Sequence, residues 1–74
     1  MPKLPVISGR RARRAFEKVG WVFNRQRGSH TLLVKTGMPF NLTIPDQKEL
    51  DRGLWRGVIR DAGLTVEEFV ELLS

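Results

Sequence analysis

The stretch that decides the fold is WVFNRQRGSHTLLV, residues 21–34. Residues 21–23 and 31–34 are mostly aromatic, β-branched or leucine, which is typical of strands. The Gly28-Ser29 pair between them is typical of a turn. The sequence therefore predicts a β-hairpin at the centre of the chain.

Regular alternation along a strand places every second side chain on the same face of the sheet. One face of the first strand would then hold Trp21, Phe23, Arg25 and Arg27. One face of the second strand would hold His30, Leu32 and Val34, and the other Thr31, Leu33 and Lys35. Apolar residues on both faces of the second strand indicate that it is central.

One helix is expected before the hairpin. Residues 1–7 contain Pro2 and Pro5 and should be extended, and Ser8 should cap the helix that follows. Its apolar stripe has the spacing of a helix and consists of Ala12, Ala15, Phe16 and Val19. The opposite face carries Arg10, Arg13, Arg14 and Lys18. Gly20 stands where a left-handed residue ends a helix.

After the hairpin, residues 36–39 contain Gly37 and Pro39 and predict a turn. Residues 40–44 predict a third strand, which Pro45 should end. Three consecutive strands with short turns form an antiparallel meander.

Two helices are expected after the strands. Residues 48–50 lead to a helix from Gly53 to about Ala62, stopped by Gly63. Its apolar side consists of Leu54, Trp55, Val58, Ile59 and Ala62. In the last helix Thr65 and Glu68 predict a capping box, Leu64 and Phe69 predict a hydrophobic staple, and Leu72 and Leu73 complete the buried side.

The order helix, three strands, helix, short helix predicts an α+β fold with the helices on one face of the sheet. This arrangement is like the double-stranded-RNA-binding fold. We expect one domain over residues 1–74. The other face of the sheet would be left for solvent or a partner.

Composition excludes several classes of site. The chain has no cysteine and one histidine, so disulfides, thiolate metal sites and His-rich metal sites are excluded. The Asp and Glu residues show no recognisable metal-ligand spacing, and no metal or small-molecule cofactor is expected. No apolar run is long enough for a membrane span or a signal peptide, which predicts a cytoplasmic protein.

Charge is strongly segregated along the chain. Residues 1–35 carry nine Lys/Arg and one acid, whereas residues 36–74 carry four Lys/Arg and seven acids. A basic half rich in arginine favours binding of a nucleic acid. The alternative is a solvated, arginine-rich surface of a heat-stable protein.

His30 is the candidate catalytic residue, because it enters the second strand beside Arg25 and Arg27. Imidazole titrates near neutrality and can act as a general acid or base. Gly28 and Ser29 would shape the turn that positions it. The alternative is a hydrogen-bonded histidine next to an ordinary hairpin turn.

The chain resembles the HicA toxin family, small mRNA interferases of bacterial toxin–antitoxin pairs. Five pieces in order carry the resemblance, from the N-terminal segment to the last helix. They are Leu4-Pro5-Val6-Ile7-Ser8-Gly9; Gly20-Trp21 with Arg25-Gln26-Arg27-Gly28-Ser29-His30; Thr43-Ile44-Pro45; Lys48-Glu49-Leu50 with Gly53; and Ile59-Arg60-Asp61-Ala62-Gly63-Leu64-Thr65 with Glu67-Glu68-Phe69.

The resemblance implies a double-stranded-RNA-binding-like fold and an endoribonuclease that cleaves mRNA without the ribosome. It also implies that His30 is required and that a HicB-type antitoxin covers it. Family members often carry a second histidine near the site, where this chain has Thr31 and Leu32 or Asp46 and Gln47. One imidazole therefore remains.

RNA can be cleaved by its own 2′-hydroxyl, so a metal-free scheme with His30 as general base or acid is sufficient. Side chains expected to bind the RNA are Arg10, Arg13, Arg14, Arg25, Arg27 and Lys35. Two alternatives stay open: a non-catalytic RNA-binding module of the same fold, and an interaction protein that docks a partner on its open sheet face.

Overall fold

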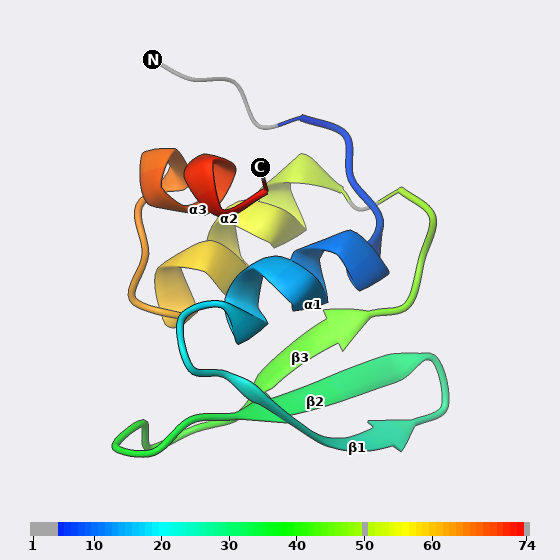
Figure 1. The fold of residues 1–74 in the computed structure, drawn as a ribbon. Helices are drawn as coiled ribbons and strands as arrows, with labels where there is room; N and C mark the ends of the chain where they lie inside the picture. The colour runs from blue at the N-terminus through cyan, green and yellow to red at the C-terminus, as the bar shows by residue number, and fades with distance from the viewer. Residues whose placement is uncertain (1–4, 50, 74) are drawn as a thin grey trace.

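The computed structural model describes residues 5–49 and 51–73, and its elements follow the expected order. They are α1 (Gly9–Glu17), β1 (Val22–Arg27), β2 (His30–Val34), β3 (Leu42–Pro45), α2 (Arg52–Asp61) and α3 (Val66–Leu72). The strands form one antiparallel sheet in the order β1-β2-β3. All three helices lie on one face of this sheet (Figure 1), which confirms the predicted α+β architecture. The order is consistent with a double-stranded-RNA-binding-like fold.

Helix α1 begins and packs as its sequence predicts. The Ser8 hydroxyl accepts a hydrogen bond from the Arg11 N–H, which satisfies one free donor of the first turn. The stripe of Ala12, Ala15 and Phe16 is fully buried. Residues 5–8 form neither helix nor strand, and residues 1–4 of the predicted extended segment, with Leu4 of the first family motif, lie outside the described residues.

The sheet follows regular alternation in β2 but not in β1. Thr31 and Leu33 of β2 are buried beneath the helices, whereas His30 is exposed on the opposite, open face. In β1, Phe23 pairs with Leu33 but Arg25 pairs with Leu32, and the register shifts between them. The prediction that Phe23 and Arg25 share a face is therefore wrong, because Asn24 is an extra residue in a β-bulge.

Three aromatic rings hold the helices together. Phe16 of α1, Trp55 of α2 and Phe69 of α3 have ring centroids 5.0–6.3 Å apart, in tilted arrangements. Leu33, Leu42 and Ile44 cover this cluster from the sheet, each at most 2% exposed.

The boundaries of β3 and the buried side of α2 differ from the prediction. Phe40 and Asn41 were expected in the third strand, but β3 begins at Leu42 and Phe40 is 44% exposed. Leu54 was expected on the apolar side of α2, but it is 47% exposed in the first turn. The helix begins after Asp51, whose carboxylate accepts from two backbone N–H groups. Leu50, the end of the predicted lead-in, lies outside the described residues.

Helix α3 has the predicted cap and is tied to α1 at its end. The Thr65 hydroxyl accepts from the Glu68 N–H and the Glu68 carboxylate accepts from the Thr65 N–H, which confirms the capping box. The Lys18 ammonium donates to the Leu72 carbonyl at 2.8 Å. Cations at a helix C-terminus satisfy free carbonyls and oppose the helix dipole, so Lys18 supports the fold. No helix in the described part of the chain is long and apolar enough to cross a bilayer.

Helix α1 meets the end of β3 backbone to backbone at Gly9. The Gly9 N–H donates to the Gln47 carbonyl at 2.9 Å, and Gly9 is buried. A Cβ built on Gly9 would overlap the Pro45 carbonyl oxygen, a backbone atom that cannot turn aside. Glycine is thus required here for close approach.

Gly9→Ala should therefore destabilise the protein by about 1–3 kcal/mol, since overpacking forces the backbone to shift. Urea denaturation followed by circular dichroism measures this. The matched control is Gly57→Ala in α2, where an added Cβ meets nothing within 4 Å. That change should stabilise the helix by about 0.5–1 kcal/mol. Equal effects of the two substitutions would contradict the close-approach argument.

Candidate functional site

His30 is the first residue of β2 and lies exposed on the open face of the sheet. It follows the hairpin turn, where Gly28 adopts a φ of +57°. The turn is fixed from both sides. The Gln26 side-chain amide donates to the Gly28 carbonyl at 3.1 Å, and the Asp46 N–H donates to the Ser29 carbonyl at 2.6 Å. Gln26 and Asp46 thus hold the turn that leads into β2 through the carbonyls of Gly28 and Ser29.

A hollow of about 300 Å³ surrounds His30 on the open face, and we call it the front hollow. Its lining residues are Arg27, His30, Leu32 and Thr43. Arg27 is the partner of His30 across the hairpin, and Thr43 is the partner of Leu32 in the next strand. A cation, an imidazole, an apolar surface and a hydroxyl are therefore gathered in one place.

The bulge in β1 determines which arginines join His30. Phe23, before the bulge, pairs with Leu33 on the helix side. Arg25 and Arg27, after the bulge, pair with Leu32 and His30 and therefore lie on the open face. Both arginines are exposed, and neither has an ion-pair partner within residues 5–49 and 51–73. Unpaired guanidinium groups are available to bind phosphate oxygens in a bidentate manner.

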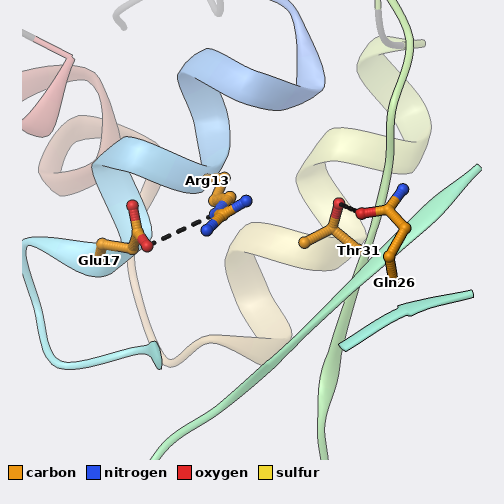
Figure 2. A network of polar contacts seen from close by, with 4 residues as sticks. All are labelled: Arg13, Glu17, Gln26 and Thr31. Atoms are coloured by element: carbon orange, nitrogen blue, oxygen red, sulfur yellow. Dashed lines mark hydrogen bonds and ion pairs between the residues drawn. The ribbon is translucent and has the colours of Figure 1, made fainter. Parts of the chain in front are cut away.

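The arginines of α1 lie on the other side of the sheet. The Arg13 guanidinium carbon is 4.5 Å from the centre of the Phe23 ring, and Phe23 is on the helix side of β1. The Arg13 Nε also pairs with the Glu17 carboxylate at 3.4 Å. Figure 2 shows Arg13 between Glu17 and the hairpin. The expected RNA-binding residues Arg10 and Arg14 line a hollow with them, about 290 Å³ in volume.

Lys35 lies far from His30 along the strand, and its side chain is close to Gly20. It follows β2 at the end opposite His30, and five residues of strand span about 16 Å. Its side chain lies near the Cα of Gly20, where a Cβ would be 3.3 Å from the Lys35 Cε. The structure therefore brings Arg25 and Arg27 to His30, sets Arg10, Arg13 and Arg14 behind the sheet, and leaves Lys35 apart.

The sequence did not single out Leu32 or Thr43 for the site. Leu32 shares the parity of His30 in β2, so alternation alone could have found it. Thr43 needed the register of β2 with β3, which the sequence does not contain. In the described ranges no three histidine, aspartate or glutamate side chains gather as metal ligands.

The side chains of the front hollow are suited to proton transfer and to the binding of negative charge. The front hollow holds one imidazole that can accept or donate a proton, beside a guanidinium that can offset negative charge. Such a pair suits a substrate in which a phosphate stands next to a group that gives up a proton during the reaction.

Comparison with models of known protein families identifies the family of the chain. No curated protein sequence matches the chain. The model of the HicA toxin of bacterial toxin–antitoxin systems matches residues 9–64, from the first residue of α1 past the end of α2. The match includes the whole sheet and the Gly28-Ser29-His30 turn, whereas α3 falls outside it. It covers well over half of the sequence, and the chain therefore belongs to the HicA toxin family, the toxins of bacterial toxin–antitoxin systems.

Proposed function

We propose that this toxin is a metal-independent endoribonuclease that cleaves mRNA, with His30 as its general acid or base. The observation that carries the proposal is the front hollow, where the exposed imidazole of His30 lies beside its cross-strand partner Arg27. mRNA as substrate places the activity in the cytoplasm.

The chemistry needs no nucleophile from the protein. His30 takes the proton of a ribose 2′-hydroxyl, and the oxygen attacks the adjacent phosphorus. The bond from phosphorus to the 5′-oxygen breaks, and that oxygen takes a proton from water or from the imidazolium. The products are a 2′,3′-cyclic phosphate and a 5′-hydroxyl. Arg27 and Arg25 bind the phosphate and offset its charge as the phosphorane forms.

A single imidazole limits the rate. One positioned acid or base contributes roughly 10²–10⁴-fold. In the front hollow the other polar groups are the guanidinium of Arg27 and the hydroxyl of Thr43. The enzyme is therefore slow, which suffices for a toxin that disables a message with one cut.

We further propose a HicB-type antitoxin as the partner that covers the open face. The end of this face away from His30 is apolar, with Val22 60% exposed and paired with Val34. The His30 end is basic. A partner with an apolar surface and acidic side chains would cover both ends and exclude RNA from the front hollow.

The alternative is a non-catalytic RNA-binding module of the same fold, in which Arg27 and the exposed His30 only bind RNA. His30→Ala separates the two functions. The variant should lose cleavage of single-stranded RNA by about 10²–10⁴-fold, yet keep its affinity, since one general acid–base group is removed. Gel analysis of end-labelled RNA measures the rate. Growth arrest on expression should also be lost. Unchanged cleavage by His30→Ala would exclude the catalytic assignment.

Arg27→Ala should lower kcat/KM roughly ten- to hundredfold, because hydrogen bonds to charged groups contribute about 1.5–3 kcal/mol. The salt dependence of RNA affinity should also weaken, with the slope of log K against log salt falling by about 0.7. The control is Arg56→Ala, an exposed arginine on α2 with the same charge change. Similar effects of both substitutions would reduce Arg27 to general surface charge.

The proposed route has two chemical requirements. A substrate with a 2′-deoxy nucleotide on the 5′ side of the cleaved phosphate should bind but stay intact, because the nucleophile is missing. EDTA should leave the rate on the natural RNA unchanged. Cutting of the deoxy substrate would rule out 2′-hydroxyl attack, and inhibition by EDTA that added Mg²⁺ reverses would rule out the metal-free scheme.

A further inference from the structure

A second hollow, of about 170 Å³, lies behind the sheet between α1 and the hairpin, and we call it the rear hollow. Its lining residues are Gly9, Arg10, Arg13, Gln26, Thr31 and Asp46. Its Gln26–Thr31 pair is next to the Arg27–His30 pair in the hairpin, but the two pairs point to opposite faces of the sheet. The two hollows lie on opposite faces of the sheet, and each is lined by residues of both β1 and β2.

Three of the polar side chains in the rear hollow are held in position. The Arg13 guanidinium packs on the Phe23 ring, and its Nε donates to the Glu17 carboxylate. Its two Nη groups have no partner in the described chain. The amide oxygen of Gln26 accepts from the hydroxyl of Thr31 at 3.0 Å, and Thr31 is only 7% exposed (Figure 2). Groups fixed in this way, with unused donors, are preorganised for a ligand.

Asp46 gives the rear hollow its selectivity. Its carboxylate accepts no hydrogen bond and forms no ion pair among the described residues, although Arg10 lines the same hollow. A carboxylate repels phosphate and accepts from N–H donors. The combination of the Asp46 carboxylate with the Arg10 guanidinium and the Nη groups of Arg13 fits a ligand that has adjacent donors on one edge and acceptors on another.

We propose that the rear hollow binds a guanine base of the RNA next to the cleaved phosphate; this rests on the proposed function, in which RNA is the substrate. Guanine presents N1–H and N2–H₂ to the Asp46 carboxylate, and O6 and N7 to an arginine. Adenine and uracil lack the two adjacent donors. The strand passes over the edge of β1, with its phosphate in the front hollow and its base behind.

Binding to a non-cleaving protein tests the proposal apart from catalysis. The His30→Ala chain is titrated into fluorescently labelled uridine hexamers that carry one guanine, inosine or adenine at the same position. We expect the guanine hexamer to bind roughly tenfold more tightly than the adenine hexamer, with inosine between them because it lacks the N2 amino group. Asp46→Asn should abolish this preference.

The sign of the effect distinguishes base recognition from simple charge. Removing a carboxylate from a basic surface strengthens RNA binding for every sequence if only electrostatics acts. The proposal requires the opposite for guanine, which should bind Asp46→Asn more weakly. Asp61→Asn is the matched control, an exposed carboxylate of α2 that should keep the guanine preference.

Three results would overturn the proposal: equal affinity for the three hexamers, tighter binding of all of them by Asp46→Asn, or an Asp46→Asn defect confined to neutralisation by the antitoxin. The last would make Asp46 a protein contact. Guanine preference in a wild-type chain that fails to cleave RNA would support the rear hollow while refuting the endoribonuclease.

Discussion

The contact of α1 with the end of β3 sets the geometry of the whole molecule. At Gly9 the helix approaches the backbone of residues 45–47 without a side chain between them. The same segment also contacts the hairpin turn, because the Asp46 N–H donates a hydrogen bond to the Ser29 carbonyl. A few backbone atoms thus join the first helix, the last strand and the turn that carries His30. Wherever His30 acts, its position relative to α1 is fixed by this junction.

The basic half of the sequence becomes two surfaces in the fold. The open face holds Arg25 and Arg27, whereas the arginines of α1 lie behind the sheet. Lys18, and Arg11 through a longer bond to the Leu73 carbonyl, are used to hold α3 instead. Net charge alone therefore overstates the number of cations available to a ligand, because Lys18 and Arg11 have structural partners.

Features that depend on a few neighbouring residues were predictable from the sequence. The Ser8 cap, the capping box of Thr65 and Glu68, and the turn at Gly28 each need only local chemistry. The order of elements follows from them. The prediction that the helices lie on one face of the sheet is confirmed, because their apolar stripes have few other surfaces to pack against.

Features that depend on pairing between distant segments were not predictable. Nothing in the local sequence marks Asn24 as a bulge, yet the bulge decides that Phe23 and Arg25 lie on opposite faces. The place of Asp46 beside α1 likewise follows from register and packing. His30 and the nearby arginines could be named from the sequence, but Thr43, which comes from another strand, could not.

The bulge also affects whether the exposed edge strand β1 can pair with a second copy of the toxin. Strand β1 is at the edge of the sheet and all six of its residues are exposed, so it could serve as a template for another strand. Asn24 interrupts the regular spacing of backbone donors and acceptors, and Arg25 and Arg27 repel a second copy of the same edge. The bulge and the two arginines thereby disfavour pairing of β1 with the same edge of a second copy.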